Sequence, residues 1–115
     1  MNNIGRGKYG EQLACRYLIS KGYKILERNY DCYAGEIDII ASKDDYIVFV
    51  EVKARATNAF GTPSAAVDRT RQARYVRAAQ AYLLPRGMQD CDCRFDVIEI
   101  YGEDKVEHIT DAFRS

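Results

Sequence analysis

The segment 35–53 reads GEIDIIASKDDYIVFVEVK and contains two runs of β-forming residues, one on each side of Asp44-Asp45. Aspartates are common in tight turns, so the segment is expected to fold as a β-hairpin. A hairpin about this turn fixes the register of its two strands. The pairs that matter most are Lys43 with Tyr46, Asp38 with Glu51, and Glu36 with Lys53.

The two faces of this hairpin are expected to differ, because side chains alternate along a strand. One face is apolar throughout and carries Ile37, Ile39, Ala41, Val48, Val50 and Val52. The other face carries Glu36, Asp38, Ile40, Phe49, Glu51 and Lys53. Two carboxylates directly opposite each other repel, so the pair of Asp38 and Glu51 favours a cation between them. The hairpin geometry therefore indicates a metal site.

The alternative interpretation is the ordinary wet face of an antiparallel hairpin, with Glu36 and Lys53 as a cross-strand ion pair. Ile40 and Phe49 share that face, however, and large apolar side chains indicate a covered surface. The flanking segments also supply two amphipathic helices, which are enough to cover both sides of a sheet. These observations favour the covered, metal-binding interpretation.

The composition is that of one folded domain spanning residues 1–115. With 47% hydrophobic and 30% charged residues, the chain does not belong to the disordered class. No apolar run approaches the roughly 20 residues that a membrane helix needs, and residues 1–6 lack the apolar region of a secretory signal. We therefore expect a cytoplasmic protein without membrane contact. Its four cysteines fit no zinc spacing and are expected to be reduced.

Charge is unevenly distributed along the chain, although the formal net charge is zero. Between Val52 and Gln89 there are seven basic residues and one acidic residue, whereas eight acidic residues face three basic ones from Asp90 to Ser115. A basic middle next to a carboxylate hairpin suits a polyanion that must reach a metal. A solvated, arginine-rich helix face is the alternative, and charge alone does not decide between the two.

The whole chain predicts the order α-β-β-β-α-β-β, with a central mixed sheet flanked by helices. We expect helices over 8–21 and from about 63 to 84, a loop over 55–64, and further strands over 23–29, 94–101 and 105–109. Thr62 is expected to cap the second long helix and Pro63 to begin it, while Pro85 and Gly87 stop it.

Polar residues lie on or beside the apolar stripes of both helices. Glu11 lies one heptad before Leu18, so its carboxylate is expected either to point toward the sheet or only to favour the helix N-terminus. Gln72 lies on the apolar stripe of the second helix. It is expected either to be a polar neighbour of the site or to lie near solvent at the helix end. The arginines beside that stripe are Arg71, Arg74 and Arg77.

The chain resembles the YraN family of small bacterial proteins and, more broadly, the restriction-endonuclease-like PD-(D/E)xK superfamily. The superfamily pattern is an acid on the first helix, then Asp38, then Glu51-Val52-Lys53 on the next strand, followed by a helix. The family resemblance covers Gly10-Glu11, residues 35–38, residues 49–53, Arg55, Phe60-Gly61, Ala66-Val67, Tyr82-Leu83, residues 94–97 and residues 111–113. One departure is Arg71, where the family usually has lysine; the charge is kept but the primary amine is not.

The resemblance implies a restriction-endonuclease-like fold, near that of archaeal Holliday-junction resolvases, and hydrolysis of phosphodiester bonds. Mg²⁺ or Mn²⁺ would bind Asp38, Glu51 and the carbonyl of Val52, since these ions prefer oxygen ligands. Lys53 would orient the attacking water or stabilise charge on the phosphate. Glu11 would complete the acidic cluster, Gln72 would support it, and Glu36 would be structural or a more distant neighbour.

We therefore expect a metal-dependent endodeoxyribonuclease acting on branched or structured DNA, with DNA favoured over RNA. Contacts to nucleic acid are expected from Arg55, Arg71, Arg74 and Arg77. Cutting two strands needs two active sites, which suits a homodimer. The alternative is a nucleic-acid-binding or scaffold protein on the same fold with weak or no catalysis, which the small size favours. A protein-interaction module is a third interpretation, supported only by the wet-face reading of the hairpin.

Overall fold

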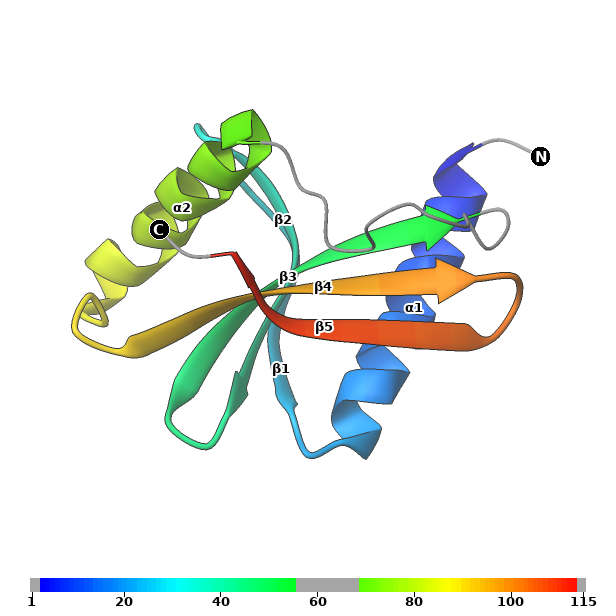
Figure 1. The fold of residues 1–115 in the computed structure, drawn as a ribbon. Helices are drawn as coiled ribbons and strands as arrows, with labels where there is room; N and C mark the ends of the chain where they lie inside the picture. Colours follow the sequence, from blue (N-terminus) through cyan, green and yellow to red (C-terminus); the bar gives the residue numbers. More distant parts are fainter. Residues whose placement is uncertain (1–2, 56–68, 114–115) are drawn as a thin grey trace.

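A five-stranded mixed sheet lies between two helices in the computed structural model of the protein, which describes residues 3–55 and 69–113 (Figure 1). The elements are α1 (Asn3–Ser20), β1 (Lys24–Cys32), β2 (Gly35–Lys43), β3 (Tyr46–Arg55), α2 (Arg69–Leu83), the short 3₁₀ helix η1 (Leu84–Arg86), β4 (Asp92–Tyr101) and β5 (Lys105–Phe113). The strands neighbour one another in chain order, and only β3 and β4 run parallel. The predicted α/β fold and element order are confirmed.

The register of β2 and β3 follows the turn at Asp44-Asp45 as predicted, from Lys43 opposite Tyr46 to Ile39 opposite Val50. The ladder stops at that last pair, so the predicted pairs of Asp38 with Glu51 and of Glu36 with Lys53 are not part of it. Just beyond, the backbone N–H of Val52 donates to Oδ2 of Asp38 over 2.8 Å. A side chain thus takes the place of a strand–strand hydrogen bond, and the two strands separate where the acidic residues begin.

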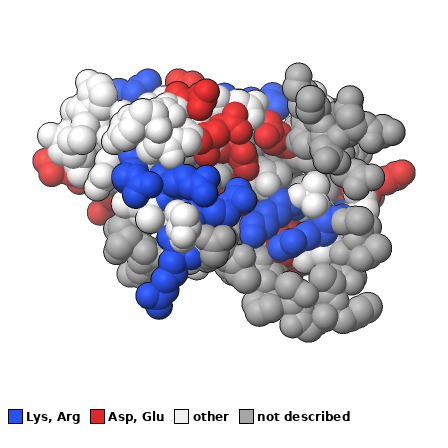
Figure 2. Space-filling model, turned by 90° about the horizontal axis from the view of Figure 1, so that it is seen from above, with Lys and Arg blue, Asp and Glu red and all other residues white. Residues whose placement is uncertain are grey.

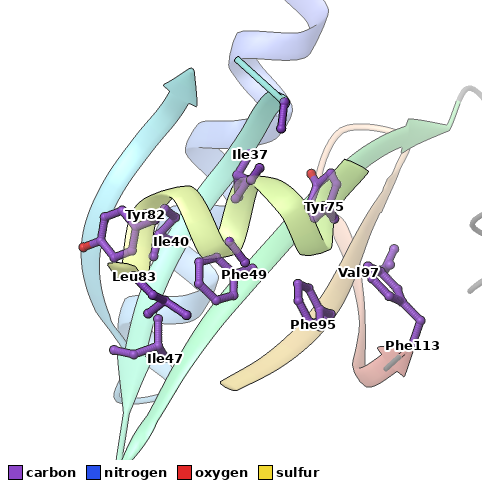
Figure 3. Packing of buried hydrophobic residues seen from close by; sticks show 13 residues of the cluster. Ile37, Ile40, Ile47, Phe49, Tyr75, Tyr82, Leu83, Phe95, Val97 and Phe113 are labelled. Atoms are coloured by element: carbon purple, nitrogen blue, oxygen red, sulfur yellow. The ribbon is translucent and has the colours of Figure 1, made fainter. Parts of the chain in front are cut away.

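Two apolar layers cover the sheet, one under each helix. On the α1 side, Ala14 and Leu18 pack against a strand surface made of Ile39, Ala41, Val48, Val50, Ile98 and Ile100. On the α2 side, Figure 3 shows the helix residues Tyr75, Tyr82 and Leu83 lying against sheet residues that include Ile40, Phe49, Phe95 and Val97. Both faces of the paired part of the hairpin are therefore covered, and the wet-face interpretation is wrong for residues 39–50.

Ile37 corrects one detail of the predicted faces. We expected it on the same face as Ile39, but it packs on the α2 side with Ile40 and Phe49 (Figure 3). The change occurs next to Asp38, where the β2–β3 ladder has ended and pairing with β3 no longer fixes the alternation of side chains.

Several element boundaries differ from those predicted. Helix α1 begins at Asn3 rather than residue 8, and β5 continues to Phe113 rather than residue 109. The extension of β5 is stabilised by stacking of Phe113 on Phe95, with ring centroids 4.9 Å apart. The predicted stop after α2 is confirmed, since Gly87 adopts φ +67° directly after η1. The loop, Thr62 and Pro63 lie outside the described residues.

Two expectations about the class of protein can be compared with the structure. Neither α1 nor α2 combines the length and the apolar character needed to cross a membrane, within the part of the chain that is described. All four cysteines are free thiols, as predicted.

Candidate functional site

A cavity of about 200 Å³ opens where β2 leaves β3 and the first turns of α2 cross the sheet. Its walls combine acidic, basic and aromatic side chains with the start of β2, and are made by Gly35, Glu36, Asp38, Arg71, Arg74 and Tyr75. The ladder's early end exposes Asp38 to this space. The cavity therefore joins the acidic hairpin to the arginines of α2.

Asp38 has a strongly perturbed carboxylate. Burial raises its pKa, the hydrogen bond from Val52 N–H works in the opposite direction, and the result is a pKa of about 7. The negative charges of Glu11, Glu51 and Glu36 add to the increase. These acids come from α1, β2 and β3, so three elements bring negative charge to one place.

Glu51 is the most buried acid of this group, with 1% of its surface exposed. Its Oε2 lies 2.6 Å from Nη2 of Arg71. Its Oε1 has no hydrogen-bond partner among residues 3–55 and 69–113. Buried carboxylate oxygens are nearly always satisfied, so this oxygen is an exception that calls for an explanation.

Tyr75 of α2 was not among the predicted site residues, but it lines the cavity. Its hydroxyl is buried and makes no hydrogen bond of regular geometry in the described structure, although the Asp38 backbone lies close enough to lower its pKa. Burial, together with the charges of Asp38 and Glu51, raises the pKa of this phenol above its ordinary range. It therefore stays protonated and is available as a donor. The signal in the sequence was its place one helical turn after Arg71 and Gln72.

The other predicted site residues surround the same cluster. Glu11 is half-buried, and its charge raises the pKa of both Asp38 and Glu36, in line with a carboxylate directed toward the sheet. Lys53 follows Glu51 by two residues on β3 and is also half-buried. Gln72 is half-buried on the first turn of α2, next to Arg71.

The donor set can be compared with the needs of a metal ion. No three acidic, histidine or cysteine side chains in the described ranges are gathered as a metal site. The predicted set needs only two carboxylates plus the Val52 carbonyl, and that carbonyl lies on the same strand edge as the N–H that reaches Asp38. Oxygen donors of this kind fit Mg²⁺ or Mn²⁺. In this structure the cation beside Glu51 is the guanidinium of Arg71.

The four arginines predicted to contact nucleic acid do not behave alike. Arg74 and Arg77 are exposed, and Arg71 is half-exposed while it binds Glu51. Arg55 instead pairs with the fully buried Glu99 of β4 over 3.1 Å. Figure 2 shows that Lys and Arg side chains form a band across this end of the molecule, next to a patch of Asp and Glu.

Comparison with known proteins places the chain among relatives of similar size. The model of the family described as "Uncharacterised protein family UPF0102" matches residues 10–100. A UPF0102 protein of Clostridioides difficile (strain 630) is 45% identical, covering 98% of this chain and 100% of its own length. One of Alkaliphilus oremlandii is 51% identical, covering 93% and 96%. One of Caldanaerobacter subterraneus is 47% identical, covering 93% of both chains.

The matched range includes Glu11, the acidic hairpin and all of α2, so the family pattern and the cavity coincide. Identity at this level, over nearly the whole length of both chains, agrees with the resemblance noted from the sequence. The chain belongs to the UPF0102 (YraN) family.

Proposed function

We propose that this protein is a divalent-metal-dependent nuclease that hydrolyses phosphodiester bonds in DNA. The observation that carries the proposal is Glu51, a buried carboxylate with one unpartnered oxygen beside a second acid, Asp38, whose pKa is about 7. A fold built only for stability has little reason to bury such a group. A cation that takes oxygen ligands would offset the free-energy cost of burying this carboxylate.

The charges around the cavity support a metal ion rather than a single ion pair. Arg71 compensates Glu51, but Glu11, Glu36 and Asp38 still act on one another. Asp38, Glu51 and the Val52 carbonyl would hold Mg²⁺ or Mn²⁺, with water and a substrate phosphate completing the shell. The ion would supply an activated water and neutralise charge that develops on the phosphate.

The protein's own groups would then position the substrate. Lys53 is on the same face as Glu51 and would orient the water or stabilise charge on the phosphate. Arg71 and Arg74, which line the cavity, would bind neighbouring phosphates, and Arg77 lies further along the same helix. The protonated Tyr75 hydroxyl would donate to an oxygen in the cavity.

Branched or structured DNA is the substrate that the resemblance to junction resolvases favours, and a homodimer would bring two sites to two strands. The basic band in Figure 2 supports a polyanionic partner. DNA as substrate agrees with a cytoplasmic location, because the similar proteins come from bacteria, whose chromosome lies in the cytoplasm.

A nucleic-acid-binding protein without catalysis is the second candidate, and one observation favours it. The Arg71 guanidinium already neutralises Glu51 without any metal ion. Such a contact would keep the acidic site stable in a protein that only binds DNA through α2.

The test combines metal binding with cleavage. Calorimetric titration with Mn²⁺ is expected to give one site that is lost in Asp38→Asn and in Glu51→Gln. Incubation with duplex, gapped, flap and four-way-junction DNA is expected to give Mg²⁺-dependent cleavage that disappears in those variants and in Lys53→Ala. DNA binding without cleavage, unchanged by the three substitutions, would establish the second candidate instead.

A further inference from the structure

Tyr33 is the most exposed large hydrophobic side chain in the described parts of the chain, with 86% of its surface accessible. The next most exposed, Ile19, has 60%. Tyr33 lies in the two-residue connection between β1 and β2, where Cys32 pairs with Gly35. Such connections usually carry glycine, asparagine or aspartate, so an aromatic residue at this turn departs from the default.

The turn that carries Tyr33 is anchored to the protein. The next residue, Ala34, is buried in the apolar cluster under α2, and Gly35 adopts φ +134°, a conformation that favours glycine. The Sγ of Cys32 also donates to the carbonyl of Gly35. The ring is therefore presented to solvent from a fixed base, with its neighbour turned inward.

The position of this turn relates Tyr33 to the candidate site. Gly35 and Glu36, two and three residues after Tyr33, line the cavity. A Cβ at Gly35 would lie 3.8 Å from Cδ of Arg74, so the stem of that arginine passes directly over the turn. In Figure 1 the β1–β2 turn lies beside the start of α2. The turn that carries the exposed ring therefore lies next to an arginine that lines the cavity.

We propose that Tyr33 stacks on an unpaired nucleobase next to the strand held at the cavity, and so selects nucleic acid that contains unpaired bases. The inference rests on the proposed function and deepens it by naming the feature of the substrate that is recognised. A ring can stack on any unpaired base, whereas bases inside a duplex are already stacked on one another. The adjacent arginines bind the phosphates on either strand type, so the ring supplies the discrimination.

Other exposed tyrosines lack this combination. Tyr46 lies at the start of β3, five residues before Glu51, and Cζ of Arg94 lies 5.8 Å from the centre of its ring. Tyr9 donates its hydroxyl to the carbonyl of Glu103. Tyr46 is therefore the matched control, because it is an exposed tyrosine outside the site.

The experiment measures equilibrium binding, in Ca²⁺ to prevent cleavage, of a fully paired duplex and of the same duplex with a short gap containing 2-aminopurine. Tyr33→Ala is expected to weaken binding to gapped DNA about tenfold and to change duplex binding by less than about twofold. It should also abolish quenching of 2-aminopurine fluorescence. Tyr33→Trp should retain both the discrimination and the quenching, and Tyr46→Ala should match the wild type.

The outcomes separate this inference from the proposed function. Equal affinity of wild type and Tyr33→Ala for gapped DNA, or equal losses on gapped and paired DNA, would overturn the role of Tyr33 while leaving Mg²⁺-dependent cleavage intact. A second outcome is that the wild type does not cleave DNA with Mg²⁺ but prefers gapped over paired DNA, and Tyr33→Ala loses this preference. That result would support the role of Tyr33 and overturn the proposed nuclease activity. A wild type that binds neither DNA would overturn both.

Discussion

Nη2 of Arg71 lies 2.6 Å from Oε2 of Glu51, so a half-exposed arginine of α2 reaches a buried carboxylate of β3. A divalent ion bound by Glu51 would have to share the carboxylate with this guanidinium or displace it. An arginine released in this way would be free to bind a substrate phosphate. If the proposed metal site exists, the pair would therefore link metal binding and substrate binding at one residue.

Removing the guanidinium is expected to strengthen metal binding. In Arg71→Ala, Glu51 loses its cation, so the metal-free protein should lose about 1–3 kcal/mol of unfolding free energy through the unsatisfied carboxylate. Mn²⁺ should then raise the melting temperature more in this variant than in the wild type, because ligand binding to the folded state stabilises it. Thermal unfolding with EDTA or Mn²⁺ measures both effects. Arg77→Ala, which removes an exposed arginine from the same helix, is the control, and equal Mn²⁺ shifts in all three proteins would contradict the competition.

The raised pKa of Asp38 predicts an unusual pH dependence of stability. The folded protein keeps this carboxyl protonated up to about pH 7, whereas the unfolded chain releases the proton near 3.8. The folded state thus binds more protons between these values, and the stabilisation present below pH 4 is lost as pH rises through 7. The loss is on the order of 2–4 kcal/mol.

Asp38→Asn tests this linkage, because asparagine keeps the acceptor for Val52 N–H and cannot ionise. Urea unfolding in EDTA at pH 5 and pH 8 should show a smaller fall in stability for the variant than for the wild type. In the wild type, Mn²⁺ affinity should rise over the same interval as the carboxyl ionises. Parallel stability curves for the two proteins would show that Asp38 ionises at an ordinary pH.

Local sequence patterns predicted much of this architecture, because they are enough to fix a hairpin. The turn at Asp44-Asp45 and the alternation of apolar residues set the register as far as Ile39 and Val50. The separation of the strands beyond that pair depends on the Asp38 carboxylate taking the Val52 N–H, a side-chain contact that alternation does not describe. The sequence identified the acids, but not the end of the ladder that opens the cavity.

The contacts between α2 and the sheet were less predictable, because they depend on how the helix crosses the strands. The contact of Arg71 with Glu51 and the place of Tyr75 in the cavity wall both follow from that crossing. Arg55 shows the same limit, since its partner Glu99 is 44 residues away in the chain. Helical periodicity predicts the face of the helix on which a residue lies, but not the residues that it contacts in the rest of the fold.

A second buried acid, Asp96, is predicted to serve stability rather than the candidate site. Arg94 donates to both of its oxygens, His108 lies 2.8 Å from Oδ2, and the backbone N–H of Asp111 donates to Oδ1. Burial alone would raise the pKa of Asp96, but the hydrogen bonds from His108, Arg94 and Asp111 lower it below its ordinary value. The stabilisation is therefore present above about pH 4 and is lost as pH falls below it.

Asp96→Ala should lower the free energy of unfolding by about 3–5 kcal/mol, because it leaves the Arg94 guanidinium, the His108 ring and the Asp111 N–H without their partner. Urea unfolding at pH 7 measures the loss, with Asp104→Ala in the exposed β4–β5 turn as the control. If the variant still folds, its Mn²⁺-induced shift should equal that of the wild type. A changed Mn²⁺ shift would mean that this network also supports the acidic cavity.

The arginines of α2 are predicted to determine how strongly DNA binding depends on salt concentration. Arg71 and Arg74 line the cavity, so the double variant Arg71→Ala plus Arg74→Ala should bind DNA more weakly at low salt. Each phosphate contact contributes about −0.9 to the slope of log affinity against log salt on duplex DNA, so losing both should flatten the slope by up to roughly 1.8. Fluorescence anisotropy between low and moderate salt gives this slope directly.

The control double variant, Arg16→Ala plus Arg28→Ala, removes the same charge from exposed positions on α1 and β1. It should leave the slope close to that of the wild type. If both double variants flatten it equally, the effect comes from net charge, and α2 is not the surface that holds the phosphates.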